Sequence, residues 1–167
     1  MSADKTENAS RLSAHAREEI DAAIKKYPEG RSRSAVFAAL HAVQHEHGYL
    51  PPEMIDAVAD YLGLEAIKVQ EVATFYSMYE MKPVGRNSIS VCTNISCMLR
   101  GSEEIVAHVE RKLGIKTGET TADGRAFLKC EEECLAACAG APMMMVNHKY
   151  YENLTPEKVD EILDGLE

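Results

Sequence analysis

The sequence predicts an α+β protein in which a small helical bundle precedes a small α/β domain. Apolar residues recur with helical spacing in four segments of the first half. After Pro83-Val-Gly85 the spacing changes to strand-like alternation, and the elements then follow in the order β-α-β-β-β-α. We therefore expect a boundary near residues 80–87, with a helical domain over residues 13–82 and an α/β domain over residues 83–167.

The first half is expected to contain four short helices that end at glycine or proline. Their expected ranges are residues 13–27, residues 34–47, the segment between Pro51-Pro52 and Gly63, and residues 65–75. Ser13 suits an N-cap, and Gly48 follows the second helix as a natural stop. Short connections between such helices favour a bundle. Residues 1–12 are expected to be a disordered leader.

The second half alternates between strand and helix patterns. The expected elements are a strand at 88–92, a helix at 102–113, a strand at 127–128, a hairpin of 143–146 with 150–152, and a last helix starting at Thr155-Pro156. The hairpin is expected to turn at Asn147-His148. Both pairs of cysteines, at 92/97 and 134/138, would then lie on loops at strand ends, where two loops can converge.

Composition excludes several classes of function. The chain has 167 residues, of which 46% are hydrophobic, and its formal net charge is −9. The negative charge is spread evenly, so no basic stripe indicates nucleic-acid binding. We expect no membrane span and no export signal, because no apolar run is long enough and residues 1–10 are polar. Five cysteines in such a protein indicate metal or redox chemistry rather than structural disulfides.

Four cysteines form two closely spaced pairs. Cys92 and Cys97 have the spacing C-x4-C, and Cys134 and Cys138 have the spacing C-x3-C. Soft thiolate ligands suit zinc, copper(I) or an iron–sulfur cluster. Spacing alone leaves zinc and a [2Fe–2S] cluster open. A disulfide oxidoreductase is disfavoured because the C-x-x-C spacing of such enzymes is absent.

The second pair could also be formed by Cys130 and Cys134, which have the same spacing. The intervening residues Glu131-Glu-Glu133 would bring three carboxylates against an anionic cluster, whereas Leu-Ala-Ala lies between Cys134 and Cys138. We therefore predict Cys134 and Cys138 as ligands. Cys130 is predicted to be a non-ligand thiol that packs as a small hydrophobe.

Longer motifs surround both pairs. They are Val-Ala-Thr-Phe-Tyr-Ser-Met-Tyr-Glu-Met-Lys-Pro-Val-Gly at 72–85, Cys97-Met-Leu-Arg100, Leu-Gly-Ile-Lys-Thr-Gly-Glu-Thr-Thr at 113–121, and Ala141-Pro-Met-Met144. Together they closely resemble the thioredoxin-like [2Fe–2S] subunit of bacterial NADH:quinone oxidoreductase, respiratory complex I. The resemblance covers about residues 15–165.

The resemblance implies a fold, a cofactor and a role. It implies a thioredoxin-like [2Fe–2S] ferredoxin domain that binds one cluster through Cys92, Cys97, Cys134 and Cys138. The protein would be a one-electron carrier in an NADH dehydrogenase module, next to a partner subunit that binds FMN and NADH. It would lie in the cytoplasm, peripheral to the inner membrane through the complex. No residue is expected to act in acid–base catalysis, and the isolated chain is not expected to oxidise NADH.

Two alternatives remain open. One is the equivalent diaphorase-module subunit of an NAD-linked hydrogenase or formate dehydrogenase, which would use the same chemistry. The other belongs to a different class, a free-standing zinc-binding or redox regulator. Nucleotide binding by this protein itself is disfavoured, because the sequence has no G-x-G-x-x-G after a strand and no P-loop.

One position departs from the family pattern. Ala136 stands where the family usually has glycine in Cys-Leu-Gly-x-Cys. If the backbone there needs a positive φ, alanine costs on the order of 1 kcal/mol. The cysteines are unchanged, so the substitution affects local stability rather than ligand identity.

The remaining candidates have simpler interpretations. His41, His45 and His47 are close in sequence and could share a metal, but a solvated helix face is the preferred interpretation. Met143-Met-Met145 could pack over a cluster, with core packing of a strand as the preferred role. Tyr150 and Tyr151 are expected on the hairpin surface.

Overall fold

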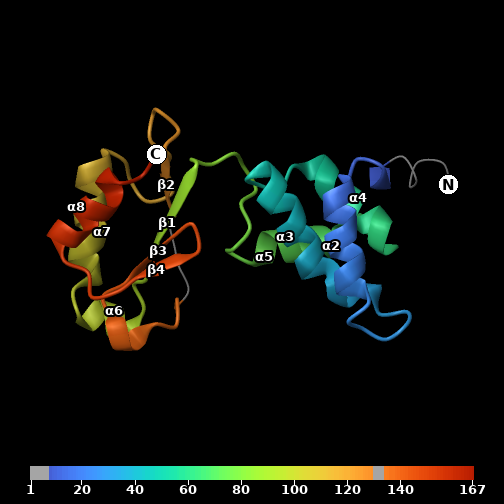
Figure 1. Cartoon of the computed structure of the whole chain (residues 1–167), viewed down its shortest axis with the longest axis horizontal. Coiled ribbons are helices and arrows are strands. Elements are labelled where there is room, and N and C mark those ends of the chain that lie inside the picture. Colours follow the sequence, from blue (N-terminus) through green and yellow to red (C-terminus); the bar gives the residue numbers. More distant parts are fainter. Residues whose placement is uncertain (1–7, 130–133) are drawn as a thin grey trace. The chain divides into compact units, whose positions relative to one another are not determined.

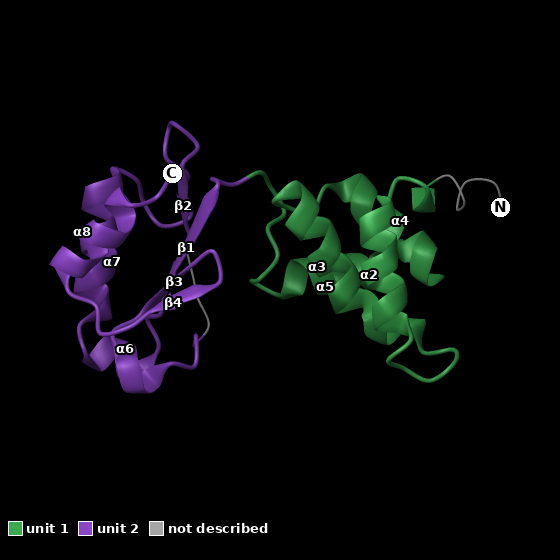
Figure 2. Ribbon diagram, in the orientation of Figure 1, with its two compact units in different colours: residues 1–83 green, residues 84–167 purple. Residues whose placement is uncertain are grey.

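The computed structural model describes residues 8–129 and 134–167. The chain divides into two compact units, Met1–Pro83 and Val84–Glu167, shown in different colours in Figure 2. The first unit is helical and the second combines helices with a four-stranded sheet (Figure 1). The predicted α+β class is confirmed.

Unit 1 is a bundle of short helices around one apolar core. Its elements are α2 (Ala14–Ile24), the 3-10 helix η1 (Ser32–Ala35), α3 (Val36–His47), α4 (Pro52–Leu62) and α5 (Ala66–Phe75). Fully buried aliphatic side chains from successive helices meet in the core, among them Ile20, Leu40, Ile55, Val58 and Val69. Removing this apolar surface from water is what holds such short helices together.

The helix ends of unit 1 follow from local chemistry. The Ser13 side chain accepts a hydrogen bond from the Ala16 backbone N–H at 2.9 Å and caps α2. Gly48 and Gly63 end α3 and α4 with left-handed backbones, at φ values of 76° and 70°. Glycine adopts this conformation without the steric cost of a Cβ, so these stops are predictable from the sequence.

One feature of unit 1 differs from the sequence prediction. The predicted leader includes residues 8–12, yet Leu12 is 1% exposed and Asn8 donates a side-chain hydrogen bond to Asp60 at 2.9 Å. The rest of the predicted leader, residues 1–7, lies outside the described residues.

Unit 2 is built on a mixed four-stranded sheet with the order β2-β1-β3-β4. Its elements are β1 (Asn87–Val91), α6 (Ile95–Leu99), α7 (Ser102–Leu113), β2 (Ala126–Leu128), the 3-10 helix η2 (Cys138–Gly140), β3 (Met144–Val146), β4 (Lys149–Tyr151) and α8 (Pro156–Asp164). β1 pairs with β2 in parallel, and it pairs with β3 antiparallel. The β3–β4 hairpin turns at Asn147 and His148, as predicted.

The two faces of this sheet have different neighbours. Alternate residues of β1 and β3, including Ile89, Val91, Met144 and Val146, pack with residues of α7 and α8. Figure 1 shows these two helices along one side of the sheet. Successive side chains of a strand point to opposite faces, so the residues in between face the other way. That second face leads to the cysteines.

A single alanine in the cysteine region has an unfavourable backbone conformation. Ala136 has a φ of 60°, which is in the left-handed region. A Cβ in that region meets the following carbonyl oxygen, at a cost of roughly 1–2 kcal/mol. The conditional expectation from the sequence, that alanine is unfavourable if φ is positive here, therefore applies.

We expect Ala136→Gly to raise the free energy of unfolding by on the order of 1 kcal/mol. Glycine removes the unfavourable Cβ contact, and this gain exceeds the cost of the freedom that glycine adds to the unfolded chain. Urea unfolding of the reduced, metal-free full chain measures this. Ala137→Gly is the matched control, because Ala137 has a φ of −110° and glycine relieves no strain there. Equal loss of stability in both variants would contradict this account.

Candidate metal centre

The first cysteine pair is held by β1 and the short helix α6. Cys92 directly follows β1, and its backbone N–H donates to the carbonyl oxygen of Met143 at 3.1 Å. Cys97 lies within α6. Both cysteines are buried, with exposed fractions of 3% and 2%. A strand end and a helix, rather than a flexible loop, thus orient the buried pair.

Helix α6 was not predicted from the sequence, and Asn94 is the residue that starts it. The Asn94 side chain accepts a hydrogen bond from the Ile95 backbone N–H at 2.8 Å. Asparagine is a preferred N-cap residue, so this was the signal available in the sequence. The turn that begins at Asn94 brings Cys97 back toward Cys92, and Asn94 itself lines the cavity that the two cysteines share.

The second pair lies in the segment before β3. Cys134 and Cys138 are exposed, in contrast to the first pair. The backbone N–H of Ala136 donates to the sulfur of Cys134 at 3.4 Å. Cys138 begins the 3-10 helix η2. The left-handed backbone at Ala136 belongs to the turn that makes this N–H···S contact.

All four predicted cysteines line one cavity of about 60 Å³, together with Asn94, Ile95 and Ser96. The structure thus brings together residues that are far apart in the sequence, such as Cys92 and Cys138. Cys130 and Glu131–Glu133 lie outside the described residues. Sequence reasoning also overlooked Leu135, a buried residue that packs against Cys92 and Cys97.

The two buried thiols differ in acidity. Burial raises the pKa of Cys97, and the contact with the Cys92 thiol raises it further. Burial also opposes ionisation of Cys92, but hydrogen bonds from the backbone of Leu135 and Asn94, together with those from the Cys97 and Cys134 thiols, lower the pKa of Cys92. Two adjacent thiolates therefore need a compensating positive charge, which metal ions supply.

The donor set fits a group bound by soft ligands. Four cysteine sulfurs are the ligand set of a [2Fe–2S] cluster, and also of a structural zinc ion. The four thiols share one cavity, but within residues 8–129 and 134–167 no three His, Cys, Asp or Glu side chains are already arranged so that they could hold a metal ion. His41, His45 and His47, the other metal candidates from the sequence, are exposed on α3.

The three consecutive methionines have different surroundings. Met143 is 0% exposed and packs with Cys92 and Cys97. Met144 is also fully buried, but in the core shared with α7 and α8. Met145 is half-buried and packs against the cysteine side. Each of the two roles considered from the sequence, packing by the cysteines and packing in the strand core, thus falls to different residues of the run.

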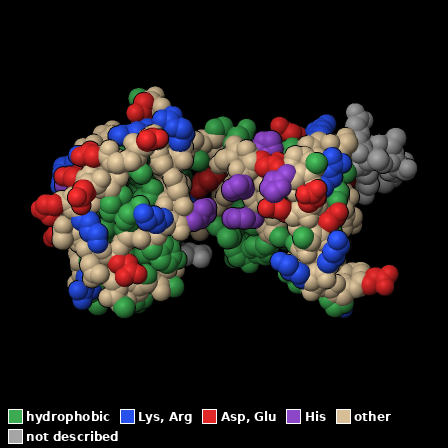
Figure 3. Space-filling view, viewed as in Figure 1, with side chains coloured by type: hydrophobic (Ala, Val, Ile, Leu, Met, Phe, Trp, Pro, Cys, Tyr) green, Lys and Arg blue, Asp and Glu red, His purple; other side chains and the backbone are tan. Residues whose placement is uncertain are grey.

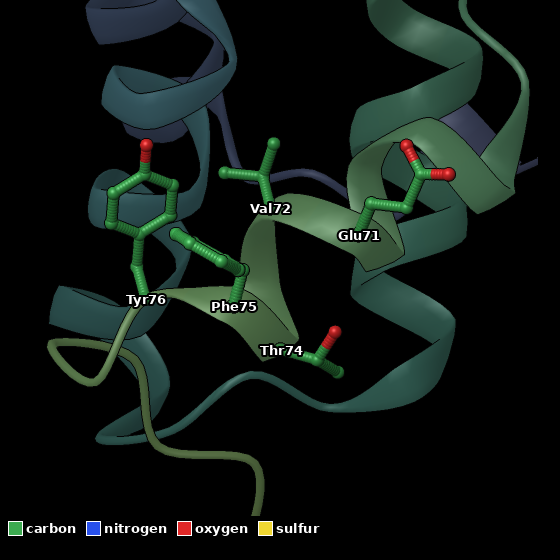
Figure 4. A pocket seen from close by; sticks show the side chains of 5 residues that line it. All are labelled: Glu71, Val72, Thr74, Phe75 and Tyr76. Atoms are coloured by element: carbon green, nitrogen blue, oxygen red, sulfur yellow. The ribbon is translucent and has the colours of Figure 1, made fainter.

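A larger cavity of about 490 Å³ lies in unit 1, at the end of α5. It is lined by Glu71, Val72, Thr74, Phe75 and Tyr76, whose side chains are shown in Figure 4. This cavity has no cysteine in its lining, so it is not the candidate metal centre. Phe75 is 80% exposed, which is unusual for a phenylalanine.

The surface carries mixed charge. On the face shown in Figure 3, Lys and Arg side chains are interspersed with Asp and Glu. Among the described residues, no helix has both the length and the apolar character needed to cross a membrane.

Comparisons with known proteins bear on the whole chain. The family profile of the thioredoxin-like [2Fe-2S] ferredoxin matches residues 20–167. An NADH-quinone oxidoreductase E subunit of Rhizobium meliloti (strain 1021), the one numbered 2, is 47% identical over 150 residues, which are 90% of this chain and 88% of that protein. The NADH-quinone oxidoreductase E subunit of Rickettsia bellii (strain RML369-C) is 47% identical over 144 residues, 86% of each sequence.

A solved structure shares the fold. The air-oxidized NAD+-reducing [NiFe]-hydrogenase matches with a TM-score of 0.64 and 20% identity, over 75% of this chain and 22% of the hydrogenase sequence. The family profile covers residues 20–167, and the two cysteine pairs of this region line one cavity. Both observations indicate the same family. This chain therefore belongs to the thioredoxin-like [2Fe–2S] ferredoxin family.

Proposed function

We propose that this protein is the electron-carrying subunit of the NADH dehydrogenase module of an NADH:quinone oxidoreductase. It would hold one [2Fe–2S] cluster on Cys92, Cys97, Cys134 and Cys138. The observation that carries the proposal is the convergence of these four thiols on one cavity. The similarity to two proteins named as E subunits of NADH-quinone oxidoreductase, over most of both sequences, supports the choice of complex.

The residues of this chain bind and shield the electron carrier. When bound, a [2Fe–2S] cluster supplies a one-electron couple whose potential depends on hydrogen bonds to sulfur, burial and nearby charge. Backbone N–H groups of Leu135 and Asn94 interact with the Cys92 sulfur, and that of Ala136 interacts with the Cys134 sulfur. Cys134 and Cys138 are exposed, so this side of the site is accessible to a redox partner.

A partner subunit would bind FMN and NADH and take the hydride. The sequence of this chain has no dinucleotide fingerprint and no P-loop, so the two-electron chemistry is assigned to the partner. The complex would place this subunit in the cytoplasm, peripheral to the inner membrane. Among the open alternatives, the hydrogenase likeness is one of fold, because the identity is only 20%.

The α5 cluster, as we call the contacting rings of Phe37, Phe75, Tyr76 and Tyr79, offers a surface for docking on that flavin-bearing subunit. The rings of Phe75 and Tyr76 lie 5.0 Å apart, and those of Tyr76 and Phe37 lie 4.7 Å apart. The Tyr79 hydroxyl donates to the carbonyl oxygen of Phe37 at 3.1 Å, which connects the cluster to the core. Rigid exposed aromatic side chains of this kind anchor many protein interfaces.

The four cysteines should be individually required for the cluster. We expect serine at Cys92, Cys97, Cys134 or Cys138 to shift the EPR spectrum or to abolish iron binding, because a harder oxygen ligand replaces a thiolate. Iron content and EPR of the reduced protein measure this. Cys130→Ala is the matched control and should retain both. The ligand assignment is wrong if Cys130→Ala loses the cluster while Cys138→Ser keeps an unchanged spectrum.

The isolated chain should neither bind nor oxidise NADH, because it lacks the nucleotide and flavin motifs. Calorimetry and a diaphorase assay on the pure, cluster-loaded protein test this. Addition of the flavin-bearing subunit should allow NADH to reduce the cluster, which serves as the positive control. Turnover by this protein alone would overturn the division of labour.

Loss of the exposed ring of Phe75 should weaken assembly. We expect Phe75→Ser to raise the dissociation constant for the flavin-bearing subunit about tenfold or more, the effect typical of an interface anchor. Tyr27→Ser is the control, because Tyr27 is an aromatic residue of unit 1 that is 43% exposed and lies outside the cluster. Equal effects of the two substitutions in a titration of the partner would contradict docking through the α5 cluster.

A further inference from the structure

The pairing of β1 with β3 decides which methionines can reach the cysteines. Val91 is the cross-strand neighbour of Met144, and Ser90 is the neighbour of Met145. Val91 and Met144 both lie in the core under α7 and α8. Side chains alternate between faces, so Met145 and the preceding Met143 share the opposite face with Cys92, the residue after Val91.

Met143 contacts the buried cysteine pair in two ways. Its carbonyl oxygen accepts a hydrogen bond from the Cys92 backbone N–H at 3.1 Å. Its side chain, 0% exposed, packs in one apolar cluster with both cysteines. Leu135 and Ala141 complete this cluster.

We propose that Met143 is a positioning residue that orients Cys92 through its backbone and excludes water from Cys92 and Cys97 with its side chain. The inference rests on the proposed function, because it concerns the same four-cysteine site. We call the side chains of Met143 and Met145, which pack on the side of the cysteines, the wall. Met145 is half-buried and forms its outer edge. Met144 has no part in it, although it is equally buried.

The wall has a defined electrostatic effect. A cluster with four thiolate ligands becomes more negative on reduction, and an apolar surrounding disfavours added charge more than a polar one. The methionine thioether has no N–H or O–H group to donate to the sulfurs. Met143 therefore keeps the reduction potential of a bound cluster lower than a polar residue of similar size would.

Potentiometric EPR on the cluster-loaded full chain tests this effect. Met143→Gln should shift the reduction potential to more positive values, because the amide can donate hydrogen bonds. Met143→Leu keeps an apolar side chain of similar volume and should retain the wild-type potential. Met145→Gln should shift the potential in the same direction but by less, because Met145 is only half-buried. Met144→Leu is the matched control and should leave it unchanged.

Thiol labelling separates the wall from the cluster chemistry. In the reduced, cluster-free full chain, Met143→Ala should raise the alkylation rates of Cys92 and Cys97 several-fold relative to the wild type. The alkylation rate of Cys134 should change much less, and mass spectrometry resolves the individual cysteines. The Met144→Ala variant controls for a general loss of stability and should not favour the buried pair.

The outcomes are distinguishable. If the wild-type chain binds no [2Fe–2S] cluster, the proposed function fails, and selective labelling in Met143→Ala still decides whether the wall exists. If the cluster is present and neither glutamine variant shifts the potential, or if Met143→Ala and Met144→Ala label alike, Met143 is not the positioning residue.

Discussion

The antiparallel pairing of β1 with β3 is the interaction on which the candidate metal centre depends. Cys92 directly follows β1 and Met143 directly precedes β3, and the hydrogen bond between their backbones continues the strand pairing. The segment that carries Cys134 and Cys138 leads into β3, so the same pairing draws it to the first pair. The apolar core under α7 and α8 in turn holds the sheet, so hydrophobic burial on one face positions the cysteine sulfurs on the other.

The two cysteine pairs have unequal surroundings, and that inequality suits an electron carrier. Cys92 and Cys97 are packed among apolar side chains, whereas Cys134 and Cys138 face solvent. Burial disfavours two negative charges on the buried pair, so a bound cation would favour ionisation of both thiols. The exposed pair leaves one side of the site open to a partner, which electron transfer between proteins requires.

Local rules account for much of the fold. Residue types with known local preferences mark several element ends. Glycine favours the left-handed helix stops at Gly48 and Gly63, and serine favours the N-cap at Ser13. The hairpin turn lies at Asn147-His148, where both residues have a positive φ. Helix α6 escaped prediction because five residues are too few to show a helical period. The burial of Leu12 escaped prediction as well, because the packing of the helices of unit 1 decides which apolar residues are covered.

The sequence by itself determined the spacing of the cysteine pairs and the family, because these depend on residue identity along the chain. It also indicated that Ala136 would be unfavourable if its φ were positive, but only the folded backbone decided the sign of φ. Tertiary structure alone decided that Met143 faces the cysteines while Met144 faces the helices. Alternation along a strand says that neighbours point to opposite faces, but strand pairing and helix packing decide which face holds the site.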